Sequence, residues 1–399
     1  MKSAMVHRLR RLLLLLQAGL APLLVAAGGG PFADNDFALD VAFTPVMAGT
    51  GLLGIAGAYT AIADGLAGAL YNPAAWSNRT PYSTGSWDYD LALGWTNVPL
   101  ATTDLDNSGS NPPGLDSLML VDAGVMGQYR SFGLGLVLQS IVYSFVNPAT
   151  EQPVTLRVTR GGGGFGWHTM GGELAMGATF FAPSVAIEVA GVGEARYNGA
   201  AFEVGALYRP RGRPYRFGLA ARQAIPAELD PEGSAGLQTD EQGVRRLDGM
   251  VLPEKVIFPA EVRAGVVYLV GDRPLNRRPD DPLVQPTTRS LLLTSDVVLI
   301  GKGEGMGLEG WIADQQQPTR AEGVFSVRIG AEWEVLPDRL RLRWGNYVEP
   351  SRFDLELGRV HMAAGAVLRL TLIWDWSLSA AADVAPFYTA WGFSLGFWH

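Results

Sequence analysis

The stretch that decides the fold runs from Gly51 to Ser77 and reads GLLGIAGAYTAIADGLAGALYNPAAWS. Its small residues recur at helical spacing, so a short helix here could lie very close to other backbone. Asp64, its one charged residue, precedes Gly65, and this pair is suited to ending a helix or making a tight turn. Asn72-Pro73 then restarts a helix, with Asn as N-cap and Pro at the first helical position. The composition is typical of a plug inside a larger structure.

The residues before this stretch have the pattern of a secretory signal peptide, which we place at residues 1–27. A basic beginning is followed by an apolar run from Leu12, and small residues lie at Ala26 and Ala27. Gln17 and Pro22 interrupt the apolar run, which argues against a retained transmembrane helix. The sequence therefore predicts an exported protein.

Composition restricts the class of protein further. The 399 residues include 50 Gly, 11 Trp, 12 Tyr, 16 Phe and no Cys, which favours β-structure with tight turns and excludes both disulfides and lipid attachment to a cysteine. Removal of the signal peptide with its four basic residues takes the formal net charge from −8 to −12, so we expect no nucleic-acid partner. No later stretch has the ~18 to 20 apolar residues of a membrane helix, so a membrane location requires a closed barrel.

From Pro81 onward the hydrophobic pattern has a period of two residues. It predicts fourteen strands, at 82–97, 118–130, 131–146, 153–169, 171–183, 195–209, 214–225, 256–270, 287–300, 321–336, 339–350, 358–372, 373–386 and 388–399. An even number returns both ends of a barrel to the periplasm. We therefore expect an all-β fold: a transmembrane antiparallel β-barrel at 81–399, with a small helical N-terminal hatch at 28–80 in its lumen.

The alternation also predicts which side chains face the lipid. In FSVRIGAEWEV (325–335), Phe325 and Ile329 face one way while Arg328 and Glu332 face the other. Charges of both signs on one face and aromatics on the other fit a polar lumen and a lipid-facing surface. We expect the inward charges to form ion pairs more than to bind a carboxylate.

The connections and the C-terminus support an outer-membrane location. Tight turns alternate with long polar connections, and only 271–286 is long on the predicted periplasmic side. The last residues, WGFSLGFWH, place aromatics on one face, like the strand by which the barrel assembly machinery recognises its substrates, although His399 stands last. We expect outer-membrane lipid and this machinery as partners.

The run GAYTAIADGLAGALYNPAAWS resembles the N-terminal signature of the FadL-like outer-membrane family, which includes FadL/TodX hydrocarbon transporters and PorV-like relatives. The matching positions are Ala61, Ala63, Asp64, Asn72, Pro73 and Ala74, while Gly68 departs from the pattern. The resemblance implies a barrel of fourteen strands, an N-terminal hatch, and passage of apolar molecules. It also implies hatch roles for Gly54, Gly57, Asp64, Asn72, Pro73 and Ala74.

Residues for catalysis or metal binding are few. His168 and His361 lie on strands that we place far apart, so we expect no metal site, no cofactor and no enzyme activity. The run Gly161, Gly162, Gly163 and Gly164 interrupts a strand and predicts a kink or a lateral opening, which FadL-like transporters have in their third strand rather than the fourth. The alternative is that these glycines accommodate a bulky hatch side chain or form a plain bulge.

Two functions fit these features. The first is passive uptake of hydrophobic small molecules, such as long-chain fatty acids or aromatic hydrocarbons, through a pocket near Phe37, Phe43, Leu52, Leu53 and Tyr59. The second is a PorV-like scaffold or shuttle for secreted proteins. Small-residue hatch signatures occur in both, so the sequence leaves the choice open.

Overall fold

The structure is a computed structural model that describes residues 29–42, 44–79, 86–100, 103–109, 117–271, 275–276, 289–303, 305–337, 339–354, 357–371 and 375–398. The predicted signal peptide and Phe43, one of the predicted pocket residues, lie outside these ranges.

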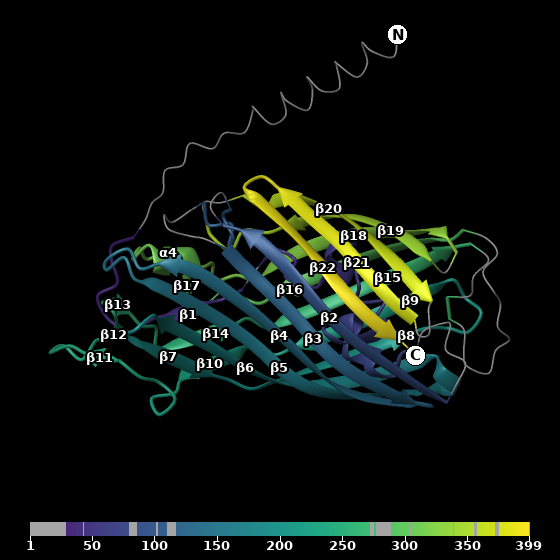
Figure 1. The fold of residues 1–399 in the computed structure, drawn as a ribbon, viewed down its shortest axis with the longest axis horizontal. Helices are drawn as coiled ribbons and strands as arrows, with labels where there is room; N and C mark the ends of the chain where they lie inside the picture. Colours follow the sequence, from purple (N-terminus) through teal and green to yellow (C-terminus); the bar gives the residue numbers. More distant parts are fainter. Residues whose placement is uncertain are drawn as a thin grey trace, which may run out of the picture.

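Fourteen antiparallel strands form a closed barrel, as predicted (Figure 1). They are β2 (Trp87–Pro99), β3 (Ser117–Tyr129), β4 (Phe132–Val146), β5 (Pro153–Thr169), β6 (Leu174–Val189), β8 (Ala201–Tyr208), β9 (Tyr215–Arg222), β15 (Glu261–Val270), β16 (Leu291–Ile300), β18 (Val324–Leu336), β19 (Leu340–Glu349), β20 (Arg359–Thr371), β21 (Asp375–Ala385) and β22 (Tyr388–Trp398). Each pairs with the next, and β2 pairs with β22 to close the ring.

The two faces of the wall follow the predicted alternation. On β18, Phe325 and Ile329 are exposed on the outside, while Arg328 and Glu332 are buried in the lumen. The same pattern holds on β2 and β22, where Trp95 packs edge-on against Trp391 with ring centroids 4.9 Å apart. An exposed apolar outer face around a charged lumen is the pattern of a membrane barrel.

Long connections gather at one end of the barrel, which we call the loop end, and the short turns at the other, the turn end. In Figure 1 the loop end lies on the left and the C-terminus lies at the turn end. At the loop end, shorter elements extend the wall: β7 (Gly193–Asn198), β10 (Ile225–Leu229), β14 (Lys255–Phe258), β17 (Met306–Gly307) and helix α4 (Leu308–Ile312). A separate small sheet is formed by β11 (Gln238–Thr239), β12 (Arg245–Leu247) and β13 (Met250–Val251).

Two predicted strands are divided at this end. Residues 195–209 form β7 and β8, and residues 256–270 form β14 and β15. Pro259, between β14 and β15, has no N–H to donate to a ladder, which explains the second division. The segment before the hatch also differs from the prediction, since β1 (Ala38–Asp40) joins the extended wall, parallel to β14 and β17.

The long connection 271–290 lies at the turn end, between β15 and β16. These strands pair in register from Glu261 with Ile300 to Val270 with Leu291, so no register error explains its length. Its residue Asn276 folds back to accept a 2.8 Å hydrogen bond from Nε of Arg216 and to donate to three main-chain carbonyls. The connection is a real elaboration of the turn end.

The hatch fills the lumen with three short helical segments, α2 (Thr50–Leu53), α3 (Gly65–Ala69) and the 3₁₀ segment η1 (Pro73–Ser77). The predicted helical spacing does not extend past α2, because Ala56 and Gly57 have φ values of 57° and 68° and turn the chain. None of the described helices is long and apolar enough to cross a bilayer.

Candidate functional site

Asn72 forms the corner of the hatch and caps η1, as predicted. Its Oδ1 accepts a 3.0 Å hydrogen bond from the backbone N–H of Ala74, and Pro73 follows at the first helical position. Its Nδ2 donates to the carbonyls of Thr60 in the hatch and Ala206 in β8, at 2.9 and 3.1 Å. Asn72 is fully buried, so it joins two parts of the hatch to the wall.

Trp76 presses the hatch against the wall. Its ring is fully buried and its Nε1 donates a 2.8 Å hydrogen bond to Oγ1 of Thr179. A Cβ added to Gly164 would lie 2.1 Å from that Nε1, and one added to Gly135 would lie 2.5 Å from the ring. The glycines therefore leave the space that this side chain fills.

This contact corrects the prediction of a lateral opening at Gly161–Gly164. The ladders from β5 to both β4 and β6 run through all four residues without a shift of register. The wall is paired on both sides here, and the run does not form a gap. The alternative considered from the sequence, glycines that accommodate a bulky hatch side chain, agrees with the position of Trp76.

Asp64 and Gly54 also hold the hatch in place, through contacts with residues of the hatch and of the wall. Asp64 Oδ1 accepts hydrogen bonds from Asn78, at 2.7 Å, and from Arg216, whose guanidinium is buried, at 3.0 Å. Gly54 lies so close to β20 that a Cβ there would be 3.1 Å from the Cα of Gly365. Small residues thus permit the close approach of backbones that their spacing predicted.

The predicted pocket residues do not form one pocket. Leu52 and Tyr59 line a cavity of about 260 Å³ on the turn side of the hatch. Leu53 is fully buried in the core, and Phe37 packs against Phe32 at the loop end, with ring centroids 4.4 Å apart. The error arises because β1 carries Phe37 into the extended wall, away from the helical segments.

The turn-side cavity has a mixed lining. Acidic residues and arginines face it from β2, β3, β18, β19 and β20, together with apolar residues of α3. Arg343 lies beside it, with its Nη2 2.6 Å from Oε2 of Glu332, and its Nη1 donates to the carbonyl of Gly51. Arg343 is thus paired both with the wall and with the hatch, as the sequence predicts for a lumen, whereas Oδ1 of Asp122 is buried without a hydrogen-bond partner among the described residues.

A second cavity, of about 110 Å³, lies on the loop side of the hatch. Its apolar wall comes from Val41, Ala42, Pro45, Met47, Leu70, Ile141, Val158, Phe258 and Ile300, and its arginines are Arg160, Arg222, Arg263 and Arg328. Arg222 and Arg263 share Glu261, which lies 2.9 and 2.5 Å from them. We call this space the arginine cavity.

Arg160 and Arg328 have no ion pair among the residues that the structure describes. The Arg160 guanidinium lies 5.0 Å from the ring centre of Phe181, and that of Arg328 lies 5.9 Å from the ring centre of Tyr347. Nη2 of Arg160 and Nε of Arg328 are buried without a hydrogen-bond partner in the described part of the chain. Two buried cations with unused donors make this cavity a candidate anion site, because such groups are costly to bury unpaired.

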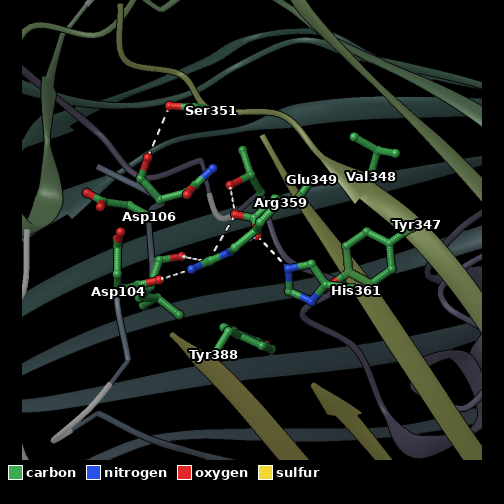
Figure 2. Close-up of polar contacts among 12 residues, drawn as sticks. Asp104, Asp106, Tyr347, Val348, Glu349, Ser351, Arg359, His361 and Tyr388 are labelled. Carbon is green, nitrogen blue, oxygen red and sulfur yellow. Dashed lines mark hydrogen bonds and ion pairs between the residues drawn. The ribbon is translucent and has the colours of Figure 1, made fainter. Parts of the chain in front are cut away.

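A buried polar network joins the hatch to the wall near the loop end (Figure 2). Glu349, at the end of β19, pairs with Arg359, lies 2.6 Å from Nε2 of His361 and accepts a 2.5 Å hydrogen bond from Oγ1 of Thr44. The other ring nitrogen of His361 lies 3.0 Å from Asp383. His168 instead has its Nδ1 3.3 Å from the carbonyl oxygen of Ser77, so the two histidines serve separate contacts.

Comparison with known proteins gives a likeness in structure without a match in sequence. No family model matches the chain, and no curated protein matches it by sequence. The structure resembles a Pseudomonas aeruginosa FadL homologue with a TM-score of 0.54 at 12% identity, over 90% of this chain and 99% of that one. It also resembles the CymD monoaromatic hydrocarbon channel (TM-score 0.53, 11% identity, 90% and 98% covered) and the P. putida toluene transporter TodX (TM-score 0.52, 12% identity, 90% and 99% covered). The chain therefore has the FadL-like fold, a barrel of fourteen strands with an N-terminal hatch.

Proposed function

We propose that the chain is a passive outer-membrane channel for apolar molecules that carry a carboxylate, such as long-chain fatty acids. The observation that carries this proposal is the arginine cavity, where Arg160 and Arg328 offer buried, unused donors beside an apolar wall. A carboxylate neutralises such donors and accepts hydrogen bonds from a guanidinium fork. An aromatic hydrocarbon does neither, although the similarity to the CymD monoaromatic hydrocarbon channel and to the toluene transporter TodX supports an apolar ligand.

The position of the cavity supports capture from the loop end. Its lining joins residues just after β1, such as Val41, with Met47 and Leu70 of the hatch. The volume of about 110 Å³ holds a head group and a few carbons, so the remainder of a long chain extends beyond it. The hatch, meanwhile, keeps water and ions from passing through the barrel, because its side chains fill the lumen.

Among the residues that the structure describes, Leu70 is the one that lines both the arginine cavity and the turn-side cavity. It lies at the C-cap of α3 and is half-buried. A ligand that moves from one cavity to the other therefore passes this side chain, and a local displacement of α3 is enough to join the two spaces.

Binding of oleate and of toluene to the detergent-purified barrel tests the proposal, with calorimetry as the readout. Loss of one charge-assisted hydrogen bond costs about 1.5–3 kcal/mol, so Arg160→Gln is expected to weaken oleate binding about 10- to 150-fold and to leave toluene binding unchanged. The matched control is Arg196→Gln, an exposed arginine of β7. Equal oleate affinity in the Arg160→Gln variant would contradict the assignment of the cavity.

Uptake into proteoliposomes separates a channel from a scaffold. We expect the unmodified protein to admit oleate and the Arg160→Gln variant to admit it more slowly. Absence of uptake of either ligand, together with co-purification of a secreted protein, would favour the PorV-like alternative.

A further inference from the structure

Three carboxylates from two distant parts of the chain meet at the loop end. Asp104 and Asp106 come from the connection between β2 and β3, and Glu309 comes from α4. One carboxylate oxygen from each lies within 4.8 Å of the other two. Figure 2 shows Asp104 and Asp106 side by side next to Arg359.

No cation of the protein neutralises this cluster among the residues that the structure describes. Arg359 lies nearest, but its guanidinium pairs with Glu349 and its Nη1 donates 2.7 Å to the main-chain carbonyl of Asp104. Asp106 is 7% exposed and Glu309 is fully buried.

One atom points to a missing ligand. Oε1 of Glu309 accepts a 3.0 Å hydrogen bond from the N–H of Leu105, whereas its Oε2 is buried without a hydrogen-bond partner in the described part of the chain. An unpartnered carboxylate oxygen in a buried acidic cluster is unfavourable unless the group takes up a proton or a cation binds it, and a bound cation would satisfy all three carboxylates at once.

The loop that supplies the aspartates has the order of a calcium-binding turn. Residues 104–109 read DLDNSG, which matches the first six positions of the D-x-[DN]-x-[DN]-G loop except that Ser108 takes the fifth. Gly109 has a φ of 75°, a conformation that suits glycine. The carboxylate that an EF-hand loop supplies at its twelfth position would here come from Glu309, 205 residues further along the chain.

We infer that Asp104, Asp106 and Glu309 bind one Ca²⁺ ion that fastens the first long loop to α4. The three oxygens are close enough to share one ion, because they lie within 4.8 Å of one another and two ligands of the same Ca²⁺ can be at most about 4.8 Å apart at Ca–O distances of about 2.4 Å. Mg²⁺ needs shorter bonds and a near-ideal octahedron that retains several waters, which favours Ca²⁺ at a site with three protein carboxylates. This site is separate from the arginine cavity, and its test does not depend on transport.

Terbium luminescence of the detergent-purified barrel tests the site, because Tb³⁺ occupies Ca²⁺ sites and is excited by nearby aromatic rings. Tyr143 donates to Oε1 of Glu309 at 3.4 Å, and Trp311 lies two residues after Glu309. We expect one saturable Tb³⁺ site per chain that Ca²⁺ displaces at a concentration at least ten times lower than Mg²⁺. Glu309→Gln and Asp106→Asn should each weaken Tb³⁺ binding at least tenfold, while Glu322→Gln, an exposed carboxylate of the same connection, should not.

Heat-modifiable migration in gels establishes that each variant is a folded barrel. Should a variant not fold, the unmodified protein decides the matter, because the thermal unfolding midpoint is expected to rise when Ca²⁺ replaces EDTA. An unchanged midpoint, or Tb³⁺ binding that survives both Glu309→Gln and Asp106→Asn in folded barrels, would overturn the inference.

Discussion

Replacing Asn72 with Ala tests whether the hatch is held by its corner. The variant loses the cap on Ala74 and the two bonds to the carbonyls of Thr60 and Ala206, all within the buried interior. At a net value of about 0.5–1.5 kcal/mol for each of the three bonds, the docked hatch should lose about 1.5–4.5 kcal/mol, compared with about 1 kcal/mol for an exposed cap alone. Because 1.4 kcal/mol is a factor of ten, the population of displaced hatch should rise about 10- to 1,600-fold.

Single-channel conductance in planar bilayers is the readout for this variant. The barrel ladders do not involve the Asn72 side chain, so heat-modifiable migration should be retained while openings become more frequent. The control is Asn198→Ala, at the exposed end of β7. This variant loses a 3.1 Å hydrogen bond to Asp230 and should leave conductance unchanged. If conductance were unaltered both in Asn72→Ala and after deletion of residues 47–77, the assignment of this segment as a plug would be wrong.

Three further changes follow from the geometry. Gly164→Val should disrupt the packing of Trp76 and lower the yield of folded barrel, whereas Gly161→Val, with its nearest neighbour 3.7 Å from the new Cβ, should fold normally; equal yields in gel assays would refute this. Glu349→Gln should destabilise the protein by about 3–5 kcal/mol by leaving Arg359 unpaired, and a urea unfolding midpoint equal to that of the Glu322→Gln control would contradict it. Leu70→Ala should join the two cavities and speed oleate entry in proteoliposomes, and no change in rate would argue against passage at this point.

The strands were predictable because their signal is local. Alternation along β18 or β2 is visible in consecutive residues, and each barrel strand pairs with the barrel strand that follows it, apart from the β2–β22 pair that closes the ring. The short strands at the loop end were harder to predict. For example, β1 pairs with β14, which lies more than 200 residues later in the chain. Periodicity carries no information about such a partner.

The same limit explains the error at the glycine run. From the sequence alone, a glycine in a strand is equally compatible with a bend, a gap or a close neighbour. Only the position of Trp76 in the structure distinguishes these cases. Whether an inward arginine is paired depends likewise on which strands face each other across the lumen, so alternation alone does not distinguish Arg328 from the other inward charges. The acidic order of residues 104–109 was visible in the sequence, but its partner Glu309 was not.

The distribution of contacts around the hatch argues for a local motion rather than its removal. The η1 corner lies against wall glycines and is buried on every side, so releasing it would expose Trp76 and break the bonds of Asn72. Both cavities instead adjoin the α3 flank, where Leu70 is the only residue of the described ranges that lines both. A small shift of α3 needs no break in the barrel ladder, although it alters the junction with η1, where the N–H of Asn72 donates a 2.8 Å hydrogen bond to the carbonyl of Gly68. For the channel proposed above, we therefore expect the corner to stay anchored by Asn72 and Trp76 while the α3 flank moves to pass an apolar chain between the two cavities.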